Sequence, residues 1–253
     1  DFFNHLQLDT FETDPDVSTE RVALRRTEEI ARGHPELFAE MARFAASPGH
    51  RITFLLGNHD PGLLFPAVGG KLREVLGETV TVRLGAYRFD GVHVEHGNQY
   101  FADNAYNPRR YFLSEGLAEP IVNLPWGSFF VIHLLNKIRQ ERHYFSKVYP
   151  FKYYLRWALI HDTLFALKTV VRIVTYFLWL RFHRDPRRYS SLTRTIKIIK
   201  EVGITPNITK EAKRILLTRR DIHTVIFSHT HHAGLRQIAP GKTVLAHISG
   251  KMR

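Results

Sequence analysis

Three short apolar runs in this chain each end in a polar cluster that contains histidine. The run at residues 51–56 leads into Gly57-Asn58-His59-Asp60, the run at 91–96 ends in Glu95-His96-Gly97, and the run at 224–227 leads into Ser228-His229-Thr230-His231-His232. Short apolar runs bounded by turn residues are typical of buried strands. The recurrence therefore predicts strands that carry imidazole and amide groups to one edge of a sheet.

The segments around these runs complete an α/β pattern. Residues 16–46 are predicted to form two helices, because Ser18 or Thr19 can cap the first and Gly33-His34-Pro35 interrupts the pattern before the second. The runs at 79–84 and 91–96 are predicted to pair as a hairpin through a connection around Gly85, and 243–248 is predicted to be a further strand.

The residue types in the polar clusters suit a hydrolytic site with two metal ions. Such a site needs neutral imidazoles and oxygen donors from separate loops, and a carboxylate that can bridge the ions. His229 and His231 alternate along an extended segment and can serve one ion each, while Asn58 offers an amide oxygen. The chain has no cysteine, which excludes thiolate metal sites and a cysteine nucleophile.

The order of these motifs resembles the calcineurin-like metallophosphoesterase family. That family's pattern is D-x-H, GD-x-x-D/N, GNH-D/E, a histidine beside a glycine, and GH-x-H. Four of the five motifs occur here in order: Asp1-Phe2-Phe3-Asn4, Gly57-Asn58-His59-Asp60, His96-Gly97 and Ser228-His229-Thr230-His231. The D-x-H motif and the first strand of the fold are expected before Asp1, and Ser228 stands where the family usually has glycine.

The resemblance implies a fold, a reaction and a set of residue roles. The fold is an α/β, metallophosphoesterase-type two-sheet β-sandwich flanked by helices. The reaction is the hydrolysis of a phosphate ester or pyrophosphate bond with two divalent metal ions, with Mn²⁺ expected and Fe, Zn, Co or Ni as alternatives. The implied metal ligands are Asp1 as the bridge, Asn58, His96 and His229 at one ion, and His231 at the other.

Two further residues, His59 and Asp60, are predicted to act in catalysis, and Asn4 is predicted to lie beside them. His59 is predicted to stabilise the developing charge or to protonate the leaving oxygen. Asp60 or Asn4 is expected to orient it, and Asn4 also to contact the substrate.

The positive charge of the chain is concentrated in one segment. Residues 105–220 hold 22 Lys and Arg against 7 Asp and Glu, whereas the whole chain has a formal net charge of +12. The segment also holds all three tryptophans, and residues 151–184 have apolar positions at helical spacing. We therefore expect residues 1–104 and 221–253 to form the core, and 105–220 to form a helical, basic and aromatic insertion that serves as a lid.

The insertion leaves the substrate open between several classes. Aromatic side chains interleaved with Lys and Arg suit a membrane-facing or lipid-gripping surface, with Lys168 and Arg172 as candidate substrate contacts. The insertion resembles that of UDP-2,3-diacylglucosamine hydrolases, which commonly have arginine where this chain has His59. That resemblance implies an amphiphilic or lipid-linked substrate. The absence of cysteine favours the cytoplasm, and the basic aromatic segment suggests peripheral contact with the anionic inner face of a membrane.

Three alternative readings remain. The insertion can instead be a set of ordinary solvated helices, or a surface for single-stranded nucleic acid in a nuclease or nucleotide phosphodiesterase. The chain can also be a non-catalytic interaction module on the same fold. The set of Asn58, His59, His96, His229 and His231 disfavours this last reading, because a binding surface has no need for it.

Overall fold

The computed structural model describes residues 1–8, 15–143, 151–182, 208–230, 234–239 and 242–246. Among them, two parallel strands form one small sheet: β1 (Ile52–Leu55) and β2 (Val80–Arg83). A second sheet has the order β3-β4-β7-β9-β8. Its strands are β3 (Tyr87–Phe89), β4 (Val92–Glu95), β7 (Thr224–Phe227), β8 (Gly234–Ala239) and β9 (Lys242–Ala246). The central β4, β7 and β9 are parallel, and the edge strands β3 and β8 run antiparallel to their neighbours.

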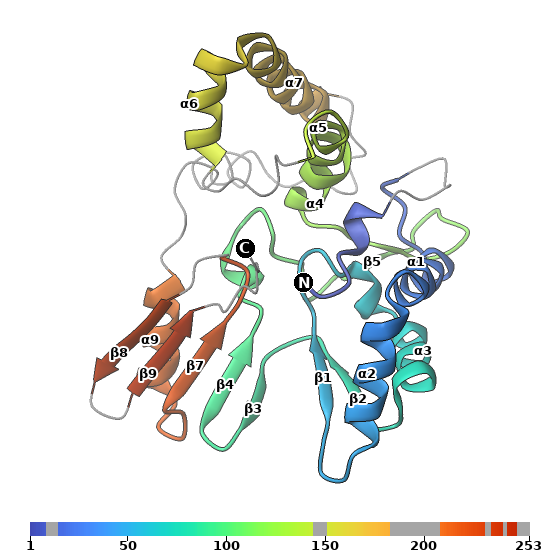
Figure 1. The fold of residues 1–253 in the computed structure, drawn as a ribbon, viewed down its shortest axis with the longest axis vertical. Helices are drawn as coiled ribbons and strands as arrows, with labels where there is room; N and C mark the ends of the chain where they lie inside the picture. The colour runs from blue at the N-terminus through green and yellow to red at the C-terminus, as the bar shows by residue number, and fades with distance from the viewer. Residues whose placement is uncertain (9–14, 144–150, 183–207, 231–233, 240–241, 247–253) are drawn as a thin grey trace.

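Three helices flank the small sheet, as Figure 1 shows. They are α1 (Glu20–Gly33), α2 (Pro35–Ala46) and α3 (Pro66–Leu76). The Thr19 hydroxyl accepts a hydrogen bond from the Val22 nitrogen at 3.3 Å and so caps α1, and Pro35 begins α2 at a position where its missing N–H costs nothing. The two predicted helices are therefore confirmed, as is the α/β class.

The predicted hairpin between residues 79–84 and 91–96 is wrong. β2 pairs with β1, and β4 pairs with β3, a strand that the sequence analysis missed. The turn between β3 and β4 is Asp90-Gly91, with φ of 44° and 72°. Asp-Gly favours positive φ at both central residues of a two-residue hairpin turn. The hairpin signal thus lies at Asp90-Gly91 and not at Gly85.

The large sheet carries its own helix, α9 (Ile208–Thr218), which contacts β7 and β9. Its buried side chains form one apolar cluster with the sheet, including Ile208, Ala212, Leu216, Val225 and Phe227. The sequence analysis placed the residues of α9 within the insertion, whereas their packing joins them to the sheet.

The other helices of the 105–220 segment lie beyond the carboxyl ends of β1, β4 and β7 in Figure 1. The chain passes through β5 (Phe112–Leu113), β6 (Ile121–Val122), α4 (Trp126–Phe130), a π-helical turn η4 (Val131–Leu135) and α5 (Asn136–Glu141). It continues in α6 (Phe151–His161) and α7 (Thr163–Phe182). A small apolar cluster that includes Ile138, Tyr154 and Phe165 joins α5, α6 and α7. None of the helices that the structure describes is long and apolar enough to cross a membrane.

Candidate metal centre

The polar clusters meet where the parallel strands end. Gly57-Asn58-His59-Asp60 follows β1, His96 follows β4, and Ser228-His229 follows β7. Parallel strands present their carboxyl ends at the same edge of a sheet, so β4 and β7 bring His96 and His229 together. Asp1 lies between the two sheets, beside these loops (Figure 1).

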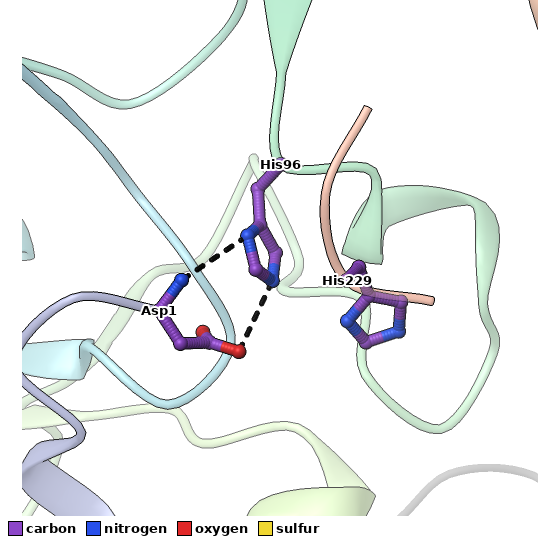
Figure 2. A group of neighbouring side chains, drawn as sticks. All are labelled: Asp1, His96 and His229. Atoms are coloured by element: carbon purple, nitrogen blue, oxygen red, sulfur yellow. Dashed lines mark hydrogen bonds and ion pairs between the residues drawn. The ribbon is translucent and has the colours of Figure 1, made fainter. Parts of the chain in front are cut away.

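Three side chains converge on one point. The potential ligand atoms of Asp1, His96 and His229 all lie within 4.8 Å of one another (Figure 2). His96 Nε2 lies 3.3 Å from Asp1 Oδ2 and 3.1 Å from Asn58 Oδ1. Two imidazoles, a carboxylate and an amide oxygen form a mixed nitrogen and oxygen donor set that suits a divalent transition metal. These residues therefore fit the metal site that the sequence predicts around Asp1, Asn58, His96 and His229.

Neighbouring side chains fix the direction of these donors. Asn58 Nδ2 donates to Asn104 Oδ1 at 3.0 Å, so the amide oxygen of Asn58 faces His96. His96 Nδ1 lies 2.8 Å from the Ser228 hydroxyl and 3.3 Å from the Asp1 nitrogen, which leaves Nε2 directed toward the carboxylate. Partners of this kind orient metal ligands and set their basicity.

His229 adopts an unusual backbone conformation. Its φ is +67°, a left-handed region that residues with a Cβ seldom adopt. Its ring packs against Phe101 and His96, with centroid separations of 4.5 Å and 5.1 Å. Ser228 is not among the residues with positive φ, which explains why serine is tolerated at that position.

A second polar group lies next to these donors and contains His59. His59 Nδ1 is 2.8 Å from Asn4 Oδ1, and the His59 backbone nitrogen donates to Asp1 Oδ1 at 2.9 Å. The Asp60 carboxylate accepts the backbone N–H groups of Phe2 and Asn4, both at 2.6 Å. Asp60 is fully buried and therefore holds the Asp1–Asn4 loop in place, whereas Asn4 is the residue that touches His59.

Burial keeps His59 and His96 neutral near pH 7. It lowers the pKa of His96 to about 3, against the opposing charge of Asp60. Burial also lowers the pKa of His59 to about 4, against the opposing charge of Asp60, and Arg139 is one of several smaller causes. A neutral imidazole is the form that binds metal, so His96 needs no deprotonation near pH 7.

The other predicted site residues lie elsewhere or outside the described ranges. Lys168 and Arg172 are on α7, and both form ion pairs with Glu141 at the end of α5. His231 lies outside the described residues. Asn4 is the one predicted substrate contact that the structure brings beside the histidines.

Sequence reasoning missed the supporting residues. Asn104 orients Asn58, and Tyr106 donates its hydroxyl hydrogen to the Asn58 backbone oxygen at 3.2 Å. Asn98 Nδ2 donates to the Asn104 backbone oxygen at 2.9 Å and so fixes that loop. These residues follow no repeated spacing, and only the proximity of Asn98 to His96-Gly97 could have pointed to the loop.

Comparison with known proteins gives one match. A family model described as calcineurin-like phosphoesterase matches residues 29–233, a span that contains Asn58, His59, His96 and His229. No curated protein and no solved structure matches the chain. Asp1 and Asn4 precede the matched span, so their place at the site rests on their contacts.

Proposed function

The chain belongs to the calcineurin-like phosphoesterase family, and we propose that it hydrolyses a phosphate ester or pyrophosphate bond of an amphiphilic substrate at the centre formed by Asp1, His96 and His229. The family consists of phosphoesterases that depend on two metal ions. The observation that carries the proposal is the convergence of these ligand atoms within 4.8 Å, with Asn58 Oδ1 beside them.

We assign the metal ligands as follows. Asn58, His96 and His229 would hold one ion, Asp1 would be shared with a second, and His231 would contribute to the second. Mn²⁺ is the proposed ion, with Fe, Zn, Co or Ni as alternatives. When bound, the pair supplies an activated water and polarises the phosphoryl oxygens.

The remaining residues position the substrate and handle a proton. The Asn4 amide oxygen accepts from His59 Nδ1, so His59 Nε2 is free to face a phosphoryl or leaving oxygen. A bound phosphate dianion next to Nε2 favours the charged imidazolium, because an opposite charge within about 4–6 Å raises a histidine pKa. His59 then stabilises the developing charge or passes a proton to the leaving oxygen. Asp60 acts indirectly, through the loop that carries Asp1 and Asn4.

A hollow beside Asn4 supports an apolar part in the substrate. A cavity of about 550 Å³ extends from Asn4 and Gln7 to the first two helices. Its walls include Phe2, Phe3 and Phe38. Ligand cavities of this size are commonly lined by aromatic and aliphatic side chains. The cavity therefore suits an alkyl or aromatic group attached to the phosphate.

The surface of α6 and α7 supports contact with a lipid surface. Many of its large apolar side chains are exposed: Trp157, Leu159, Ile160, Leu164, Leu167, Val170, Val171, Val174 and Leu178. Leu164 on α7 is 81% exposed. Contiguous exposed apolar surface beside exposed cations such as Arg156 is typical of membrane-surface helices. We propose that these helices form a lid over the substrate and contact an anionic membrane.

The nuclease alternative has less support. Lys168 and Arg172, the two basic residues of the insertion that were predicted to contact the substrate, pair with Glu141. These pairs reduce the charge that α7 presents to a nucleic acid.

The test is hydrolysis of aryl phosphate monoesters and diesters with added Mn²⁺, together with measurement of bound metal. We expect turnover by the wild type, and loss of both turnover and metal in His229→Ala. His50→Ala is the matched control, because His50 is exposed and its ring packs against Phe44, which is not part of the centre. A folded wild type that stays inactive with Mn²⁺, Co²⁺, Ni²⁺ and Zn²⁺ contradicts the proposal.

A further inference from the structure

A second cavity, of about 420 Å³, lies beside the turn that follows Asn4. This turn is η1 (His5–Gln7), and the cavity reaches from it to α1 and α5. Its polar lining residues are Gln7, Arg26, Asn136, Lys137, Arg139, Gln140 and His143. None of these residues belongs to the metal centre.

The lining is strongly positive. Arg26 contributes a guanidinium from α1, and Lys137 and Arg139 contribute two cations from α5. Arg26 is only 3% exposed, and its side chain forms part of the cavity lining. None of the described residues that line the cavity carries a carboxylate. Several cations at a partly enclosed wall raise the local concentration of anions.

Direct contacts connect the cavity to the Asp1–Asn4 loop of the centre. Gln7 N donates to the Asn4 backbone oxygen at 2.9 Å, and the Arg139 guanidinium donates to the Gln7 side-chain oxygen. Asn136 Nδ2 donates to the Leu6 backbone oxygen at 2.9 Å. Asn4, the hydrogen-bond partner of His59, therefore lies at the start of one short turn, and Gln7, which lines the cavity, lies at its end.

We propose that this cavity binds a second phosphate group of the substrate, so that the enzyme prefers compounds with two separated phosphates. The inference rests on the proposed phosphoesterase function, because one phosphate lies at the metal centre while the other lies against Lys137 and Arg139. Guanidinium groups bind phosphate through paired hydrogen bonds, and an exposed lysine adds a charge that reaches the ligand. The volume is within the range of ligand cavities, about 300–1,000 Å³.

The test compares alkane-1,n-diol bisphosphates of three to eight carbons with alkyl monophosphates of the same lengths, with Mn²⁺ present. The measured quantity is the ratio of kcat/KM for the bisphosphate to that for the monophosphate. We expect the best-matched bisphosphate to be preferred by roughly tenfold or more, and Lys137→Gln to reduce that preference by roughly tenfold through KM. Arg139→Gln is the second variant, and Lys213→Gln, an exposed lysine on α9, is the matched control.

The outcomes separate the cavity from the proposed function. A wild type without preference overturns the inference. A preference that survives in both folded variants also overturns it. If no probe is hydrolysed, the proposed function fails. Calorimetric titration with the same bisphosphates then tests whether the cavity binds a phosphate group. The inference is supported if the wild type binds a bisphosphate and Lys137→Gln binds it more weakly. It is overturned if the wild type binds none of the bisphosphates.

Discussion

The side chains of Asn4 and His59 share a hydrogen bond of 2.8 Å between Oδ1 and Nδ1. An amide oxygen only accepts, so His59 Nδ1 carries the hydrogen and the lone pair of the neutral ring is on Nε2. Asn4 has no charge with which to stabilise an imidazolium, and burial lowers the pKa of His59 to about 4. The free enzyme therefore holds His59 neutral near pH 7 and oriented for a substrate that brings the negative charge.

For His59→Ala we expect kcat to fall by roughly two to four orders of magnitude while bound metal is retained, because charge stabilisation and proton transfer typically contribute 10²–10⁴-fold. The assay is hydrolysis of an aryl phosphate with Mn²⁺, with metal content measured on the same sample. Loss of metal in this variant would instead make His59 a ligand. His50→Ala controls for removal of an imidazole at an exposed position.

Asp60→Asn should destabilise the protein and weaken metal binding together. The carboxylate accepts two backbone hydrogen bonds of 2.6 Å, whereas an amide offers one oxygen and presents N–H groups to the second donor. Hydrogen bonds to charged groups contribute about 1.5–3 kcal/mol, so a loss of about 2–4 kcal/mol of unfolding free energy is expected. Urea unfolding with and without Mn²⁺ measures it.

The control for this prediction is Asp221→Asn, the same change at an exposed aspartate. Unchanged stability in Asp60→Asn, or an equal loss in both variants, would show that the loop does not depend on the Asp60 carboxylate.

Stability should fall as the pH decreases from about 6.5 toward 4, in part through His5. Burial lowers the pKa of His5 to about 4 in the folded protein, below the ordinary value of 6.5. Between these values the unfolded chain binds more protons, so the folded state loses stability as the pH falls and has its full stability above 6.5. The contribution of His5 between pH 7 and pH 5 is on the order of 1–2 kcal/mol.

His5→Gln isolates this contribution, because glutamine does not titrate and can still contact Thr27, which lies 3.2 Å from His5 Nε2. Urea midpoints in the presence of chelator should depend less on pH in His5→Gln than in the wild type, while His50→Gln should follow the wild type. Parallel pH curves for wild type and His5→Gln contradict the prediction.

Substitutions on α7 should reduce membrane binding. Leu164 and Leu167 are exposed by 81% and 53%, and burying one such side chain in lipid contributes about 1.5–3 kcal/mol. The double variant Leu164→Glu, Leu167→Glu should therefore lower co-sedimentation with anionic liposomes by at least tenfold. Leu217→Glu on α9 is the control, because Leu217 is 80% exposed on another helix. Equal binding by all three proteins, or none by any, removes the membrane proposal.

The sequence predicted the parts of the site that follow a strand, because a strand fixes where its last residue lies. Asn58, His59 and His96 are of this kind, and their strands form at 52–55 and 92–95. It could not predict Asn104 or Tyr106, which reach Asn58 from an irregular loop with no periodic pattern. The strand β3 was missed because three residues are too few for alternation to be recognised. The role of Lys168 and Arg172 as partners of Glu141 required the packing of α5 against α7, which composition does not encode.

The centre joins two halves that share no strand pairing among the described residues. Asn58 follows a strand of the β1–β2 sheet, whereas His96 and His229 follow strands of the five-stranded sheet. Asp1 lies between these residues. An ion held by both halves acts as a crosslink, and a ligand that binds only the native state stabilises it by RT ln(1 + [L]/Kd). Metal binding at the centre would thus couple local unfolding of one sheet to local unfolding of the other. Amide hydrogen exchange in β1 and β7 would then slow together.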